Sequence, residues 1–162
     1  MEKSKRLSLD SYHLDDLMVA PNAVFRKGGE VPQPVVSVDF RSFVHATNGH
    51  VFAMSLTIKS EEPIAEEQPL RFSITIVGFF TVEEPIVDGK LPPERAVNAL
   101  TILYGIARGY LGTTAGWFDR TIVLPTVYFS DVIQERLSGT KHNEIAGADP
   151  PQIETGTEVS AQ

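Results

Sequence analysis

The chain contains no cysteine among its 162 residues. This absence excludes thiolate catalysis, cysteine-ligated metal sites and a disulfide framework. Positive charge is also scarce, because 14 Lys and Arg stand against 21 Asp and Glu and leave a formal net charge of −7. A nucleic-acid-binding surface needs clustered basic side chains, so nucleic acid is not an expected partner.

Long apolar runs are missing as well. No stretch approaches the roughly 18 apolar residues that a membrane-spanning helix requires. The N-terminus carries Lys3, Lys5 and Arg6 like a signal peptide, but acidic residues from Asp10 onward interrupt any apolar segment. The composition, 42% hydrophobic and 22% charged, is that of a globular domain with a core of its own. We therefore expect one cytoplasmic domain without membrane insertion.

The sequence also lacks the usual signatures of catalysis and metal binding. The four histidines, at positions 13, 45, 50 and 142, include no i, i+4 pair that would suit a metal. The glycine-rich stretch at 109–116 does not end in the Gly-Lys-Ser/Thr of a phosphate-binding loop, and there is no Gly-x-Ser-x-Gly elbow. We therefore expect a binding protein rather than an enzyme, with no metal and no cofactor.

Alternating apolar residues predict four strands. Residues 6–19 carry a weak pattern, whereas 36–40, 52–59 and 70–82 alternate clearly. Asn48-Gly49 is a strong hairpin signal, because both residue types tolerate positive φ. The strands follow one another at hairpin spacing, which predicts an antiparallel meander with one uniformly apolar face.

The connection after the first strand is unusually long. Residues 21–34 hold three prolines and two glycines, which predicts an irregular segment. A loop of this length inside a compact domain usually has a function.

Two helices are predicted after the strands. The first covers residues 94–115, because Pro93 and the acid that follows it are typical of a helix start and the apolar residues then recur at helical spacing. The second begins at Ser130, a capping residue, and runs to Leu137, with Gly139 as its C-terminal stop.

The last part of the chain is polar. Residues 140–162 contain two prolines and one lysine against four acids, a net charge of −3. Such a segment cannot bury enough apolar surface to fold, so we predict a disordered acidic tail. The predicted organisation is one domain over residues 1–139 and a tail over 140–162.

Three glycines interrupt the predicted long helix. Gly105, Gly109 and Gly112 lie on one face at i, i+4 and i+7, and each costs about 1 kcal/mol relative to alanine. One interpretation is a close backbone contact with another helix or with the sheet, which offsets this cost. The other is that Gly105 or Gly109 kinks or ends the helix early. A contact with a second copy would make the protein an oligomer.

Taken in order, three stretches of the chain resemble the SecB family of protein-export chaperones, across residues 10–138. The first is APN at 20–22, followed by a proline-rich crossover, and it resembles the segment that ends the first strand in the family. The second, VGFF at 77–80, is similar to a glycine-then-aromatic pattern late in the sheet. The third, residues 102–132, combines the long helix, a glycine exit and LPTVYFSD before the last helix.

The resemblance implies an α+β fold, with a four-stranded antiparallel meander followed by two helices. It implies a homotetramer, a dimer of dimers with the long helices and therefore Gly105, Gly109 and Gly112 at the interface. It also implies that unfolded preproteins are held in hydrophobic grooves without ATP. The crossover and the last helix contribute to these grooves.

Apolar residues of the crossover, the adjoining strand and the last helix are the candidate client contacts. They are Phe25, Val31, Val36, Val38, Phe40, Phe129 and Ile133. Ordinary core packing is the alternative for each of them. Phe25 and Val31 are the stronger candidates, because a Gly/Pro-rich loop is difficult to bury.

The SecB family passes clients to the ATPase SecA through acidic residues on the solvent face of the sheet. Asp15 is the candidate SecA contact here, whereas Val19, Arg71 and Ser73 depart from the family pattern. A holding function could therefore serve export, a toxin–antitoxin system or a phage. The alternative is an oligomeric protein of the same fold with a structural or small-ligand role and no client or SecA binding.

Overall fold

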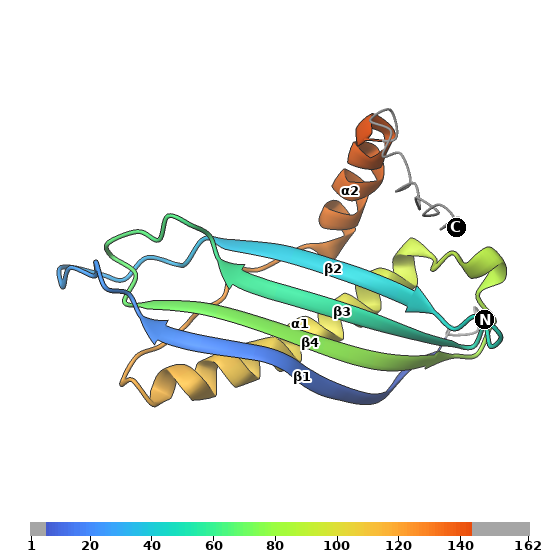
Figure 1. Cartoon of the computed structure of the whole chain (residues 1–162), viewed down its shortest axis with the longest axis horizontal. Coiled ribbons are helices and arrows are strands. Elements are labelled where there is room, and N and C mark those ends of the chain that lie inside the picture. The colour runs from blue at the N-terminus through green and yellow to red at the C-terminus, as the bar shows by residue number, and fades with distance from the viewer. Residues whose placement is uncertain (1–5, 144–162) are drawn as a thin grey trace, which may run out of the picture.

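The computed structural model describes residues 6–143, with side chains through residue 138. Its elements are β1 (Leu7–Pro21), β2 (Val36–Val44), β3 (Val51–Ser60), β4 (Leu70–Val82), the 3-10 turn η1 (Val87–Gly89), α1 (Pro93–Gly116) and α2 (Phe129–Asn143). The strands form one antiparallel sheet; α1 crosses behind it, and α2 extends away from the sheet beside β2 (Figure 1). The predicted α+β fold, a four-stranded antiparallel sheet followed by two helices, is confirmed.

The order of the strands is β1-β4-β3-β2. The predicted meander therefore holds for β2, β3 and β4, while β1 pairs with β4 along its whole length instead of with β2. Residues 22–35 must consequently cross from one edge of the sheet to the other (Figure 1). This crossing explains why the connection is long, since a hairpin loop could not span two intervening strands.

One face of the sheet carries the core. Side chains at alternate positions of β3 and β4 are almost completely buried there: Phe52, Met54, Leu56, Ile58, Phe72, Ile74, Ile76 and Phe80. The helix α1 covers them with Leu100, Leu103 and Leu111. Burial of each large apolar side chain stabilises the fold by roughly 1.5–3 kcal/mol, so this layer dominates stability.

Gly78 lies on the same face of β4, directly below α1. A Cβ atom at this position would lie 2.8 Å from Leu103 Cδ2 and 2.9 Å from Phe80 Cε2. The glycine of the VGFF stretch therefore leaves room for side chains packed between helix and sheet.

The hairpin between β2 and β3 is confirmed, but the reason for its glycine differs from the expectation. Neither Asn48 nor Gly49 has positive φ, and the connection spans residues 45–50. The Nδ1 atom of His45 accepts the backbone N–H of Asn48, and a Cβ at Gly49 would lie 2.9 Å from the carbonyl oxygen of Ile86. Gly49 is thus needed for close backbone approach rather than for a left-handed turn.

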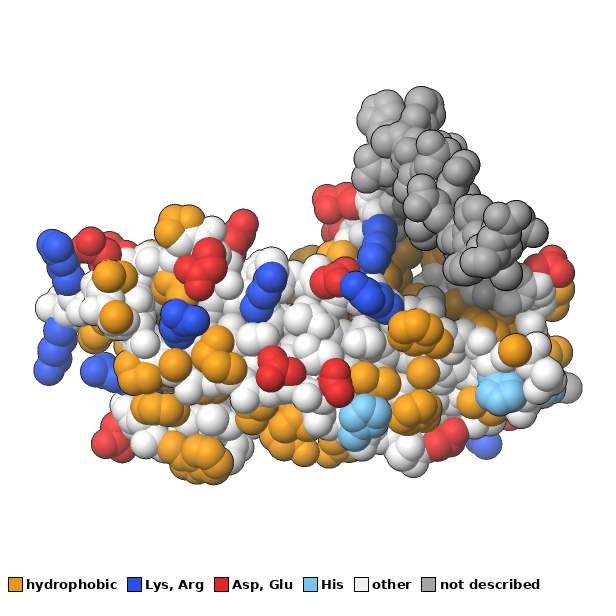
Figure 2. All heavy atoms as spheres, viewed as in Figure 1, with side chains coloured by type: hydrophobic (Ala, Val, Ile, Leu, Met, Phe, Trp, Pro, Cys, Tyr) orange, Lys and Arg blue, Asp and Glu red, His pale blue; other side chains and the backbone are white. Residues whose placement is uncertain are grey.

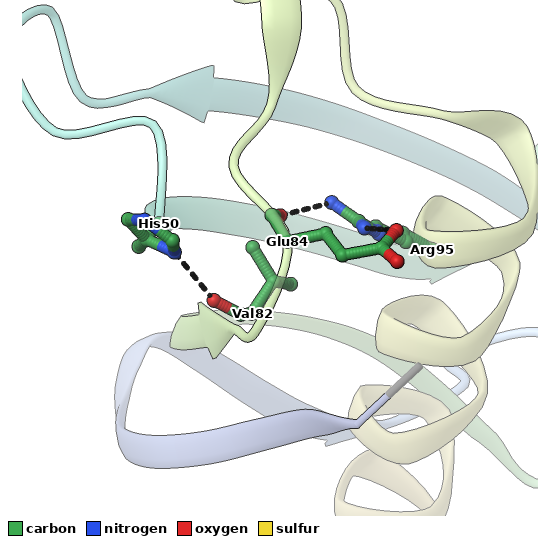
Figure 3. A network of polar contacts seen from close by, with 4 residues as sticks. All are labelled: His50, Val82, Glu84 and Arg95. Atoms are coloured by element: carbon green, nitrogen blue, oxygen red, sulfur yellow. Dashed lines mark hydrogen bonds and ion pairs between the residues drawn. The ribbon is translucent and has the colours of Figure 1, made fainter. Parts of the chain in front are cut away.

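A buried arginine ties the start of α1 to the end of β4. Arg95 is 7% exposed and donates a hydrogen bond of 2.8 Å to the backbone oxygen of Glu84, with the Glu84 carboxylate 3.4 Å away (Figure 3). Nearby, the ring of His50 shares a hydrogen bond with the carbonyl of Val82 (Figure 3). The two contacts with Glu84 compensate the cation of Arg95, which is placed at the positive end of the helix dipole.

The helix α1 is continuous from Pro93 to Gly116, so the interpretation that Gly105 or Gly109 ends the helix early is wrong. The helix α2 also passes through Gly139 to Asn143, and the predicted stop at Gly139 is therefore wrong as well. A glycine inside a helix costs only about 1 kcal/mol, which the flanking residues offset. The predicted disordered tail begins at residue 140, which is wrong for residues 140–143, because they belong to α2. The rest of the predicted tail, from position 144 onward, lies outside the described residues.

Replacing Tyr104 with phenylalanine is expected to lower the free energy of unfolding by about 1 kcal/mol, because its hydroxyl donates a 2.5 Å hydrogen bond to the carbonyl of Pro125. Burial raises the pKa of this hydroxyl, and the positive charge of Arg108 partly offsets the rise. Folding thus favours the protonated form. The contribution of the Tyr104 hydroxyl to the free energy of unfolding is present below the ordinary tyrosine pKa of about 10. It is lost as pH rises through the raised pKa. Urea unfolding measures this effect: the difference in free energy of unfolding between the wild type and Tyr104→Phe should be smaller above pH 10 than at pH 7.

Candidate functional site

The crossover between β1 and β2 is held in place by its first residue. The Nδ2 atom of Asn22 donates hydrogen bonds to the carbonyls of Ala65, at 3.1 Å, and Gln68, at 2.8 Å. Its backbone N–H donates to Pro69. The asparagine of the APN stretch therefore fixes the start of the crossover to the loop between β3 and β4.

Two further contacts hold the rest of the crossover to the same loop. The Nε2 atom of Gln68 donates a 2.6 Å hydrogen bond to the carbonyl of Pro32. Arg26 donates its backbone N–H to the carbonyl of Glu66 and forms an exposed ion pair with the carboxylate of Glu66 at 3.1 Å. The crossover is thus a positioned segment even though it contains no regular secondary structure.

Residues 32–34 of the crossover lie between two hollows in the surface. The first has a volume of about 340 Å³ and the second about 380 Å³. Both are lined by residues 32–34, Gln68 and Leu70. Because they share this wall, the two hollows lie next to each other, and we call the pair of hollows the crossover groove.

The far walls of the crossover groove come from different parts of the chain. Residues 121–123, which follow α1, line the first hollow together with Val31 and Phe72. The loop from Ser60 to Ala65 closes the second hollow next to Val35. The groove therefore joins segments that are distant in the sequence.

Large apolar side chains remain open to solvent along this groove. Val31 is 47% exposed, Val35 is 68% exposed and Val123 is 56% exposed. Isolated exposed valines are common, but three of them along one groove form a surface suited to an apolar ligand. Glu61 and Glu62 are among the residues that line the second hollow, so part of its lining is acidic.

Two of the predicted client contacts lie on the crossover. Val31 lines the groove directly. Phe25 is half-buried beneath the guanidinium of Arg120, which stands 5.3 Å from its ring centroid. Val36, Val38 and Phe40 lie on the helix-side face of β2, at the edge of the sheet, and are half-buried against the core.

The remaining two predicted contacts are core residues. Phe129 is 3% exposed and packs edge-on against Tyr104, with ring centroids 5.6 Å apart; Ile133 is 8% exposed. Their placement on an exposed groove surface is therefore wrong, because α2 turns this side toward α1 and the sheet. Sequence reasoning missed Val35 and Val123, and nothing local marks residues 121–123 as neighbours of the crossover.

The sheet face opposite α1 is open. Figure 2 shows hydrophobic, acidic and basic side chains interspersed on it rather than a field of one sign. Asp15, the predicted SecA contact, is exposed at a register irregularity of β1. Arg71 lies on this open face, where it adds positive charge.

The predicted glycine stripe lies on the solvent side of α1. A Cβ atom at Gly105, Gly109 or Gly112 would meet no atom within 4 Å, so the alternative of contact with the chain's own sheet is wrong. Gly105 and Gly109 line a hollow of about 560 Å³ between α1 and β1. Its other walls include Tyr12, Leu17, Ile106, Tyr110 and Trp117. This apolar face is not covered by any part of the chain that the structure describes.

Within residues 6–143, no group of three or more His, Asp or Glu side chains is arranged to hold a metal ion. Over the same part of the chain, no helix is long and apolar enough to cross a membrane.

Comparison with solved structures supports the fold. One similar structure is the SecB-like chaperone Rv1957 of Mycobacterium tuberculosis, in complex with a ChAD peptide from the HigA1 antitoxin Rv1956. It has 13% sequence identity and a TM-score of 0.51, and the match covers 75% of this chain and 90% of that one. A protein of unknown function from Streptococcus agalactiae matches at 11% identity and a TM-score of 0.52, over 77% of this chain and 100% of that one. No family model matches the chain, and no curated protein does. The chain therefore has a SecB-like fold.

Proposed function

We propose that this protein is an ATP-independent chaperone of the SecB-like type, which holds unfolded polypeptides in the crossover groove. The observation that carries the proposal is that three exposed valines, at positions 31, 35 and 123, line that groove. A holding chaperone needs an extended, apolar surface without strict directional demands, because its clients share no sequence. The SecB-like neighbour binds a peptide of an antitoxin, which is consistent with a polypeptide ligand.

The chemistry of the groove sets the expected client. Exposed valines favour apolar side chains, while Glu61 and Glu62 in its lining favour basic ones. The formal net charge of −7 acts in the same direction. We therefore propose clients with apolar segments flanked by lysine or arginine, among them preproteins and antitoxins, and we propose that the protein is not an enzyme.

The open face of α1 suits self-association. Trp117 is 79% exposed and lies beside glycines that allow close backbone approach. Contact between copies through this face would bury the hollow between α1 and β1. We propose a homotetramer, assembled as a dimer of dimers, with Gly105, Gly109 and Gly112 at the contact between copies.

Aggregation of a chemically denatured client tests the proposed function. Dilution of the client into stoichiometric amounts of this protein is expected to suppress light scattering without ATP. Serum albumin at the same concentration serves as the control for nonspecific protein. Unchanged aggregation, together with tight binding of one defined small molecule, would instead favour the structural or small-ligand role.

A further inference from the structure

The outer edge of β2 carries unpaired backbone groups. At one end of the β2–β3 ladder the backbone N–H of Glu61 donates to the carbonyl of Val35, and at the other end the N–H of His45 donates to the carbonyl of Val51. The odd-numbered residues of β2 between these two pairs therefore direct their backbone N–H and C=O groups toward β3. The even-numbered residues therefore point their N–H and C=O groups away from the sheet. Among the described residues, Val36, Val38, Ser42 and Val44 have no hydrogen-bond partner on this outer side.

Phe40 is the exception at the centre of this edge, and its partner comes from α2. The Nη1 atom of Arg136 donates a hydrogen bond to the backbone oxygen of Phe40. The same guanidinium lies 4.5 Å from the Phe40 ring centroid and 3.4 Å from the carboxylate of Asp39. One side chain therefore caps the edge carbonyl, covers the ring and pairs with the neighbouring acid.

We propose that Arg136 blocks the outer edge of β2 by occupying the carbonyl of Phe40. An extended client segment would displace the Arg136 side chain and pair with β2 as a further strand of the sheet. This inference rests on the proposed chaperone function. In the protein without a client, the chain's own Arg136 occupies the edge at Phe40. A client strand would take over that carbonyl and pair with the free groups on either side.

Two observations favour an extended polypeptide as the second occupant. An edge strand with free N–H and C=O groups at every second residue matches the backbone of another strand and no small ligand. The edge also begins where the crossover groove ends, because Val35 lines the second hollow and Val36 is the first residue of β2. A client lying in the groove can therefore continue along β2 over the half-buried Val36, Val38 and Phe40.

Binding of a labelled peptide measures the role of Arg136. The probe is a short peptide of alternating valine and threonine with lysines at both ends, followed by fluorescence anisotropy. Arg136→Ala is expected to tighten binding about threefold to tenfold, the worth of one net hydrogen bond. Arg41→Ala is the control. Arg41 is also an exposed arginine, but its backbone groups point toward β3 and not to the outer edge, so the peptide affinity is expected to stay unchanged.

Backbone methylation of the peptide separates strand addition from contact through side chains alone. Two versions of the probe carry N-methyl groups on either the valines or the threonines, so each blocks one edge of the peptide strand. Unequal loss of affinity between the two versions is expected. Equal affinities for the two versions would contradict the proposal. An unchanged peptide affinity in Arg136→Ala would contradict it as well.

The client-aggregation assay distinguishes this failure from failure of the proposed function. If the wild-type protein suppresses aggregation but the methylated peptides bind equally, the proposed strand addition at β2 and the role of Arg136 in it are wrong, whereas the chaperone function stands. If neither wild type nor Arg136→Ala binds peptide or suppresses aggregation, the chaperone function and the proposed strand addition are both wrong.

Discussion

Replacing Val31 and Val123 together with aspartate is expected to abolish suppression of client aggregation and to weaken peptide binding at least about 100-fold. Both side chains are substantially exposed and line the first hollow of the crossover groove. Each substitution removes apolar contact with the client and forces desolvation of a new carboxylate. About tenfold per position corresponds to about 1.4 kcal/mol, slightly less than the roughly 1.5–3 kcal/mol gained by burying a large apolar side chain completely.

The fold should tolerate this double substitution, since neither valine belongs to the core. An unchanged thermal midpoint would show that lost binding is not a consequence of unfolding. Val87→Asp is the matched control, because Val87 is 71% exposed and lies in η1, at the opposite end of the sheet from the crossover (Figure 1). Full activity of the double variant, or equal loss in Val87→Asp, would contradict the assignment of the groove.

Replacing Gly109 with leucine is expected to split the assembly into smaller species. Space for the side chain exists in the single chain, where a Cβ at this position meets nothing within 4 Å. The substitution also removes the helix cost of glycine, about 1 kcal/mol, so the isolated fold should be at least as stable. At a contact between copies the same leucine overpacks each interface by about 1–3 kcal/mol.

Sedimentation velocity measures this effect directly. The wild type should sediment as a tetramer and Gly109→Leu as dimers or monomers, with normal circular dichroism. Glu135→Leu adds the same side chain to an exposed position of α2 and should leave the mass unchanged. An unaltered mass in Gly109→Leu would mean that the glycine face of α1 does not mediate assembly.

Periodicity predicted the fold because its core is built from regular elements. β4 has the predicted bounds, Leu70–Val82, and α1 extends one residue beyond the predicted 94–115 at each end, because apolar side chains repeat there with a single period. The place of β1 beside β4 could not be read in this way. The local apolar pattern predicts that residues 6–19 form a strand, but it does not predict which strand they pair with. The pairing of β1 with β4 depends on residues 22–35, which cross from one edge of the sheet to the other.

The candidate site was predicted where local sequence restricts burial. A Gly/Pro-rich segment is difficult to bury, which predicts that Val31 is exposed to a ligand, and Val31 does line the groove. Phe129 and Ile133 follow a helical apolar pattern, which does not reveal whether that face meets the core or a ligand; they meet the core. Val123 became part of the groove only through the fold, since residues 121–123 lie far from the crossover in sequence.

Site-specific crosslinking tests the central claim, that unfolded clients occupy the crossover groove. A photoreactive amino acid at position 123 should crosslink a denatured client on irradiation, and native client should not compete. The same amino acid at position 87, on the remote turn η1, should give no product. Crosslinking at 123 but not at 87 is the predicted result; no crosslink at 123, or equal yields at both positions, would contradict the account.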